Sequence, residues 1–114
     1  MATRPLIRVR DVMKPHFDMV EGMATVAAAL EAMRHVDTKT LIVKPRSEND
    51  ELGIVVLSDI AREVLAKDRA PDRVNIYEIM VKPAITVHPD MDIRYCARLF
   101  DRFDLSRAPV VKDR

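Results

Sequence analysis

Apolar and polar positions follow two different periods along the chain, and the changes of period mark the predicted elements. Apolar residues recur three or four positions apart in 26–33 and again in 93–103, which predicts two amphipathic helices. Thr25 and Asp92 stand directly before these segments and are predicted to be their N-caps. Short runs rich in β-branched residues predict strands at 19–20, 41–43, 53–57, 85–87 and 108–111. The chain is therefore expected to fold as a mixed α/β domain.

The first half of the chain contains the order β-α-β-β-α. A turn of helix is expected to end at Met13, because Pro15 cannot continue it. The polar stretch 46–51 separates the strands 41–43 and 53–57 and predicts an antiparallel hairpin. A further amphipathic helix, 60–65, is expected directly after this hairpin, with Ser58 or Asp59 as its N-cap.

The second half of the chain repeats the first at a shift of 67 residues. Met-Lys-Pro at 13–15 is echoed by Met-Val-Lys-Pro at 80–83, and the apolar positions recur in the same order. Four pairs are identical: Met13 and Met80, Val20 and Val87, Asp37 and Asp104, and Val43 and Val110. We expect a first unit with its lead at 1–66, a polar linker at 67–73 and a second unit at 74–114.

The second unit is expected to be incomplete, because the copy of the strand at 53–57 and its helix would fall beyond Arg114. A unit without its last strand leaves an unpaired sheet edge and an uncovered core face. Two explanations stay open: the chain is a fragment of a longer protein, or a partner chain supplies the missing surface.

The formal net charge of the 114 residues is +1, which disfavours nucleic acid as a partner because the overall field for a polyanion is weak. The sequence has no apolar run long enough for a membrane span and no signal-peptide pattern, which predicts a cytoplasmic protein.

Most catalytic and metal sites lack their signatures in this sequence. His16, His35 and His88 are far apart and have no neighbouring ligand at metal-site spacing, so we expect no metal. With only two glycines the chain has no glycine-rich phosphate loop, and no nucleophile stands beside a candidate base, so we expect no enzyme activity. Cys96 lies in an apolar stripe and is expected to pack in the core.

The repeat, the Met-Lys-Pro lead, Ala-Pro-Val-Val at 108–111 and Gly-Ile-Val-Val-Leu-Ser-Asp-Ile at 53–60 together resemble a tandem pair of CBS domains, or Bateman module. The resemblance implies two β-α-β-β-α units packed about a pseudo-two-fold axis and a homodimer formed through the CBS helices. It also implies that clefts between units bind AMP, ADP, ATP or S-adenosylmethionine, and that the module is regulatory and catalyses nothing.

Asp59 is the main candidate for contact with a ligand. In CBS domains the carboxylate after the last strand accepts hydrogen bonds from the two ribose hydroxyls, and the following helix start lies near phosphate. A carboxylate can accept two O–H donors, and a helix N-terminus favours an anion. The alternative is that Asp59 only caps its helix. Related modules often place Ser or Thr three residues before this aspartate, where this chain has Val56, and Ser58 stands nearby at another spacing.

The resemblance implies further contacts from other loops. In the second unit, Pro109 matches the strand edge beside the base, and Arg107 is a candidate partner for phosphate. In the first unit Thr40 offers a hydroxyl, although Ile42 replaces the usual proline. His16 and Lys82 follow the two Met-containing leads and are candidates for phosphate contact.

Two functions therefore remain open. The first is a regulatory module that senses an adenine nucleotide or nucleoside. The second is a structural homodimerisation module whose cleft stays empty, which the departures at Val56 and Ile42 favour.

Overall fold

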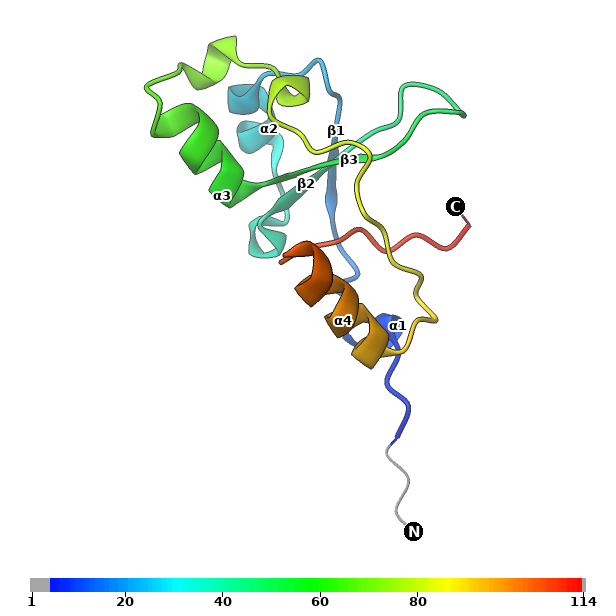
Figure 1. Cartoon of the computed structure of the whole chain (residues 1–114). Coiled ribbons are helices and arrows are strands. Elements are labelled where there is room, and N and C mark those ends of the chain that lie inside the picture. Colours follow the sequence, from blue (N-terminus) through cyan, green and yellow to red (C-terminus); the bar gives the residue numbers. More distant parts are fainter. Residues whose placement is uncertain (1–4, 114) are drawn as a thin grey trace. The chain divides into compact units, whose positions relative to one another are not determined.

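A computed structural model describes residues 5–113, which form two compact units (Figure 1). The central unit consists of residues 15–84. The terminal unit combines the described residues of both chain ends, 5–14 and 85–113. Each unit contains its own cluster of buried apolar side chains, and each is described by itself below.

The central unit is built on a three-stranded sheet in the order β1-β2-β3 (Figure 1). The strands are β1 (Asp18–Val20), β2 (Thr40–Val43) and β3 (Gly53–Val56). β1 runs parallel to β2, with Asp18 opposite Leu41, and β2 runs antiparallel to β3, with Thr40 opposite Val56. The predicted hairpin is therefore confirmed.

Gly53 fits this hairpin because there is no room for a side chain. A Cβ atom at this position would lie 3.0 Å from the sulfur of Met80 and 3.1 Å from the Cβ atom of Val43. The glycine lets the segment around Met80 pack closely on the start of β3. The next residue of that segment, Val81, forms an antiparallel bridge with Ile54 of β3.

The first helix of the central unit, α2 (Val26–Ala32), begins as predicted. The hydroxyl of Thr25 accepts a hydrogen bond from the backbone N–H of Ala28 at 3.1 Å, so Thr25 is the N-cap. A short 3-10 turn, η1 (Val36–Thr38), then leads to Lys39, whose φ of 56° lies in the left-handed region. This turn brings the chain to the start of β2.

The helix after β3 begins earlier than the sequence predicts. It consists of α3 (Leu57–Ile60) and a π-helical segment, η2 (Ala61–Leu65). Its N-cap is Val56, without a side-chain cap, so the prediction that Ser58 or Asp59 caps it is wrong. The backbone N–H of Leu57 donates instead to the carbonyl of Lys39 at 3.0 Å, so that the loop before β2 provides a partner for the helix start.

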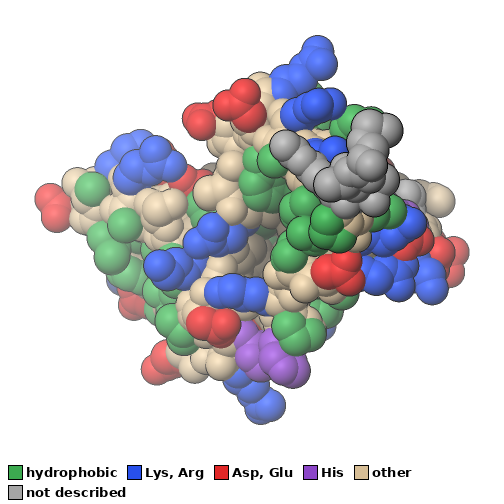
Figure 2. All heavy atoms as spheres, turned by 90° about the horizontal axis from the view of Figure 1, so that it is seen from below, with side chains coloured by type: hydrophobic (Ala, Val, Ile, Leu, Met, Phe, Trp, Pro, Cys, Tyr) green, Lys and Arg blue, Asp and Glu red, His purple; other side chains and the backbone are tan. Residues whose placement is uncertain are grey.

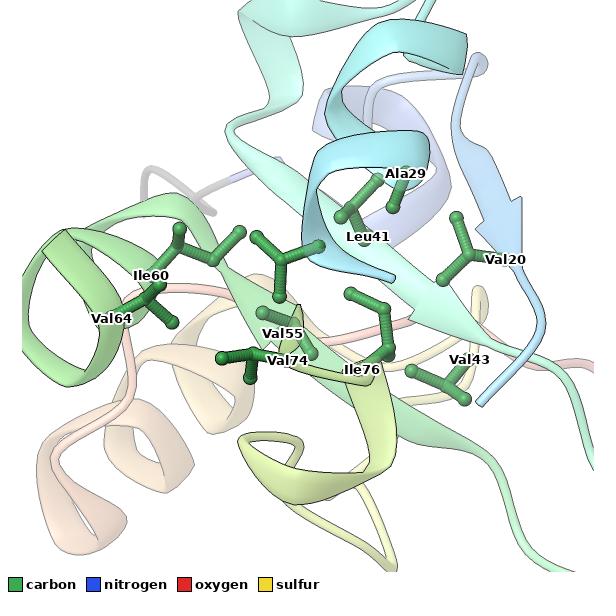
Figure 3. Packing of buried hydrophobic residues seen from close by; sticks show 10 residues of the cluster. Val20, Ala29, Leu41, Val43, Val55, Ile60, Val64, Val74 and Ile76 are labelled. Atoms are coloured by element: carbon green, nitrogen blue, oxygen red, sulfur yellow. The ribbon is translucent and has the colours of Figure 1, made fainter. Parts of the chain in front are cut away.

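The core of the central unit lies between the sheet and these helices (Figure 3). Burial alternates along β2 and β3, and the inward residues Leu41 and Val55 are 0% and 1% exposed. The segment with η3 (Pro71–Arg73) and η4 (Ile76–Glu78) contributes Val74 and Ile76 to the same cluster. Figure 3 shows these side chains pointing toward one another from sheet, helix and connecting segment.

The terminal unit contains α1 (Val9–Val12) and α4 (Ile93–Phe103). Asp92 caps α4 as predicted, since its carboxylate accepts from the backbone N–H of Arg94 at 2.9 Å. The strands predicted at 85–87 and 108–111 are wrong in extent, because they are reduced to one parallel bridge between Val87 and Val110. Within the described residues, neither segment pairs with an antiparallel strand, whereas β2 of the central unit pairs with β3.

Cys96 forms the core of the terminal unit together with Val9 and Val87. It is 7% exposed, and burial raises the pKa of its thiol. The prediction that Cys96 packs in the core is therefore confirmed.

Each repeat begins with a short lead segment, 9–15 in the first repeat and 76–83 in the second. Each lead packs against the other repeat and not against its own. Val9 and Ile76 occupy equivalent positions in the repeat, and both are buried, at 4% and 0% exposed. Val9 packs in the terminal unit and Ile76 in the central unit, so each lead completes the core formed by the other repeat. The predicted segments 1–66, 67–73 and 74–114 divide the chain by its sequence repeats, whereas the two compact units divide it by contacts. The division into repeats stays a prediction.

Candidate functional site

One end of the central sheet collects four of the seven predicted contact residues. Because β1 and β2 are parallel and β3 is antiparallel to β2, the starts of β1 and β2 lie at the same end as the last residue of β3. His16 precedes β1, Thr40 begins β2, and Ser58 and Asp59 follow β3. This arrangement, called the α3 end of the sheet below, places hydroxyl, imidazole and carboxylate groups at one edge.

Asp59 lies in the first turn of α3 with its side chain 23% exposed. Its carboxylate accepts a hydrogen bond from the guanidinium of Arg62, one turn further along the same helix. An exposed pair at this spacing stabilises a helix by only about 0.2 to 0.5 kcal/mol. Since Asp59 does not cap the helix, this pair is the only role in helix stability that the described contacts give it.

Thr40 is held in a fixed orientation by the loop before β2. Its hydroxyl donates to the carbonyl of Thr38 at 2.9 Å, and the hydroxyl of Thr38 donates to the carbonyl of His35 at 2.8 Å. Thr40 is partly buried. Its hydroxyl proton is therefore in use, while the oxygen still has acceptor capacity.

His16 packs against a second histidine that the sequence analysis did not single out as a site residue. The rings of His16 and His35 are stacked, with centroids 5.1 Å apart and planes inclined by 13°. The carboxylate of Asp18 accepts the backbone N–H groups of Arg34 and His35 at 3.0 and 2.8 Å, which fixes the loop that carries His35. Figure 2 shows histidine side chains at the molecular surface. No local motif connects these residues, because 19 positions separate the two rings.

Lys82 lies at the opposite end of β3, beside the hairpin tip, because its neighbour Val81 forms a bridge with Ile54. Its ammonium group is 2.6 Å from the carboxylate of Asp50, and both side chains are about one quarter exposed, at 23% and 24%. The hydrogen bond from Lys82, with a second from the backbone N–H of Arg46, lowers the pKa of Asp50 to about 2. The structure therefore gives Lys82 an acidic partner and does not bring it to the α3 end of the sheet.

Arg107 and Pro109 belong to the terminal unit. Pro109 is buried, and its carbonyl accepts the backbone N–H of Val87 at 3.0 Å. The guanidinium of Arg107 donates to the carbonyl of Ser106 at 2.8 Å. Pro109 is thus part of the bridge that joins the two extended segments of this unit.

Two further searches concern only residues 5–113. No group of three or more His, Cys, Asp or Glu side chains in this range comes together as metal ligands. None of the helices in the same range combines the length and the apolar character needed to cross a membrane.

Several solved structures with the same architecture contain CBS domains. The hexameric CBS-CP12 protein from bloom-forming cyanobacteria is 37% identical, with a TM-score of 0.89 over 94% of this chain and 62% of that chain. The conserved CBS domain protein TA0289 from Thermoplasma acidophilum is 29% identical, with a TM-score of 0.79 over 96% of this chain and 61% of that one. The CBS domain pair of protein MJ0100 is 25% identical, with a TM-score of 0.77 over 96% and 83%. Its structure contains 5′-methylthioadenosine and S-adenosyl-L-methionine.

Two curated relatives are longer than this chain. The uncharacterized protein MK0525 of Methanopyrus kandleri is 29% identical over 99 residues, which cover 84% of this chain and 50% of that protein. A homoserine O-acetyltransferase of Methanohalobium evestigatum is 31% identical over 102 residues, 84% of this chain but 20% of that enzyme. The chain thus spans about half of the first relative and a fifth of the second.

The family assignment rests on both halves of the chain. The model of the CBS domain family matches residues 9–66 and again residues 76–114, which together make up most of the sequence. These two matches agree with the internal repeat and with the CBS-pair folds of the solved structures. CBS-domain pair proteins are regulatory, and this chain belongs to the CBS-domain family as a tandem pair.

Proposed function

We propose that this chain is a non-catalytic regulatory module that senses an adenine nucleotide or nucleoside. The observation that carries the proposal is Asp59, a partly exposed carboxylate at the α3 end of the sheet that does not cap its helix. A carboxylate in this position can accept hydrogen bonds from both hydroxyls of a ribose. The adenosine compounds bound by the CBS pair of MJ0100 support this class of ligand.

The remaining contacts favour a ligand with little or no phosphate charge at the α3 end. Val56 provides no hydroxyl group, and the ammonium of Lys82 is paired with Asp50 at the other end of β3. Arg62 is the cation beside Asp59, and it is already its hydrogen-bond partner. We therefore expect adenosine, 5′-methylthioadenosine or S-adenosylmethionine to bind more tightly than ADP or ATP. Thr40, Ser58 and His16 are proposed as further contacts at this end of the sheet, and Arg107 and Pro109 stay predicted contacts of the terminal unit.

Calorimetric titration with these ligands and AMP tests the proposal, using Asp59→Asn as the central variant. The substitution keeps the size of the side chain and removes the charge, so binding should weaken at least about tenfold, the value of one charged hydrogen bond. Glu63→Gln is the matched control, because Glu63 is also an ion-paired carboxylate of this helix, bonded to Lys67 at 2.7 Å. Equal weakening by both substitutions, or no effect of Asp59→Asn, would contradict the proposed site.

A structural homodimerisation module without a ligand is the second candidate. Val56, Ile42 and the internal pairing of Asp59 with Arg62 favour it, since each removes a feature that a ligand site uses. Under this alternative none of the ligands raises the unfolding midpoint of the folded protein, whereas a ligand at about 100 times its Kd adds about 2.7 kcal/mol to stability. Homodimerisation, a cytoplasmic location and the exclusion of nucleic acid and membrane as partners stay predictions.

A further inference from the structure

The carboxylate of Asp59 already has a partner, and that partner is a flexible side chain. Among residues 5–113, the guanidinium of Arg62 is the only group that donates a hydrogen bond to this carboxylate. The side chain of Arg62 is 72% exposed, whereas that of Asp59 is 23% exposed. Arg62 is therefore free to turn into solvent, while Asp59 stays at the α3 end of the sheet.

The backbone that carries this pair is anchored in the core of the central unit. Ile60 and Val64 are 3% and 0% exposed, and their side chains point into the buried cluster (Figure 3). Arg62 lies in the π-helical segment η2, and π-helical turns occur frequently at functional sites. Opening of the pair therefore needs a movement of the Arg62 side chain and no movement of the helix.

A ribose at Asp59 meets the guanidinium of Arg62. Arg62 donates to one carboxylate oxygen, Oδ1. The two neighbouring hydroxyls of a ribose approach both oxygens of a carboxylate, so they need the space beside Oδ1 as well. An exposed ion pair changes an equilibrium constant by roughly fivefold at most, so a ligand can displace Arg62 at a modest cost in affinity.

We propose that Arg62 is an autoinhibitory residue, because its guanidinium competes with the ribose of the ligand for the carboxylate of Asp59. This role rests on the proposed function, in which Asp59 accepts the ribose hydroxyls. It makes Arg62 the residue that sets the affinity for uncharged adenine nucleosides. Salt weakens an exposed ion pair, so salt should strengthen the binding of an uncharged ligand at this site.

Calorimetric titration of the full chain with adenosine tests this competition, because adenosine contains the ribose and carries no charge. We expect Arg62→Met to lower the Kd for adenosine by about three- to fivefold at low salt, since the competing pair is removed. Between about 0.01 and about 1 M salt the Debye length falls from about 30 to about 3 Å. The Kd of the wild type should fall over this range by about twofold or more, and that of Arg62→Met should change less.

Two further titrations separate competition for Asp59 from a general effect of charge. In an Asp59→Asn background, Arg62→Met should change the Kd by less than about twofold, because the pair that it removes no longer exists. With 2′-deoxyadenosine, the gain from Arg62→Met should be smaller than with adenosine. This ligand lacks one of the two hydroxyls that compete with the guanidinium.

Lys67→Met is the matched control, because it removes the same charge from the neighbouring ion pair, in which Lys67 is bonded to Glu63 at 2.7 Å. It should leave the Kd for adenosine unchanged, and circular dichroism checks that every variant is folded. Arg62 is not autoinhibitory if Arg62→Met fails to tighten binding, if Lys67→Met tightens it equally, or if the gain persists in Asp59→Asn.

These results also distinguish a failure of this role from a failure of the proposed function. Binding that Asp59→Asn weakens and Arg62→Met leaves unchanged overturns the role of Arg62 alone. A protein that binds AMP but takes up no uncharged nucleoside, even as Arg62→Met, also overturns that role and keeps the proposed function. The absence of binding of every adenine ligand by every folded variant overturns both.

Discussion

The central and terminal units have similar sequence patterns but differ in their regular strand structure. The central unit contains a three-stranded sheet, and the terminal unit contains one parallel bridge. In the central unit Val43 lies in β2 between two neighbouring strands and is 2% exposed. Its counterpart in the repeat, Val110, forms a single bridge to Val87. Among residues 5–113, ten make up the buried cluster of the central unit and three make up that of the terminal unit. A β-branched run therefore becomes a regular strand here only where neighbouring strands pair with it.

The largest expected difference between the units is the cost of the same leucine-to-alanine substitution. Leu41 is completely buried in the central core, so Leu41→Ala should lower the free energy of unfolding by about 3 kcal/mol. Leu99 is only partly buried in the terminal cluster, and Leu99→Ala should cost less. Urea unfolding of both variants measures the difference.

Leu65→Ala is the control for Leu41→Ala, because Leu65 is 55% exposed in the same unit. It should lower the free energy of unfolding by less than about 1 kcal/mol. If Leu99→Ala cost as much as Leu41→Ala, the difference in core quality between the units would be refuted.

A smaller effect is expected from the exchanged leads. Val9→Ala should shift the exchange of backbone amides with solvent in α4, because Val9 packs against the same cluster as Cys96. It should leave the amides of β2 unchanged. Ile76→Ala should act in the reverse way, accelerating exchange in β2 and not in α4. Hydrogen exchange measured by mass spectrometry resolves the two regions, and faster exchange in the unit that follows each lead in sequence would contradict the exchange of leads.

The smallest effect concerns the hairpin tip of the central unit, where Lys82 is paired with Asp50. Hydrogen bonds from Lys82 and from the backbone N–H of Arg46 lower the pKa of Asp50 from 3.8 to about 2, so the ionised form is favoured in the folded state. A lowered pKa stabilises the fold above the unfolded value, and this contribution is lost as the pH falls through the folded one. Stability should therefore fall between about pH 4 and pH 2, and Asp50→Asn should reduce this fall.

Thermal unfolding midpoints at several pH values measure this contribution. Glu48→Gln is the control, because Glu48 lies in the same tip and is exposed. An unchanged pH dependence in Asp50→Asn would show that the pair with Lys82 does not stabilise the fold.

The candidate site was only partly predictable from local sequence. Asp59, Ser58, Thr40 and His16 were singled out, and strand register brings them to one end of the sheet. The stacking of His35 on His16 could not be predicted, since it depends on the loop that Asp18 holds from a distant strand. The same holds for Lys82, whose partner Asp50 lies 32 residues away. The start of α3 was misplaced because a backbone carbonyl, that of Lys39, takes the place of a side-chain cap.

The sequence by itself determined the β-α-β-β-α order, the repeat, the N-caps Thr25 and Asp92 and the burial of Cys96. These features depend on residues close in sequence or on a period that repeats along it. Only the tertiary structure decided that each lead packs in the core of the other repeat and that the two predicted strands of the terminal unit are reduced to one bridge. Each of these depends on which distant segments pack together. Hydrophobic burial drives that packing and is non-directional, so the local sequence does not specify which segments meet.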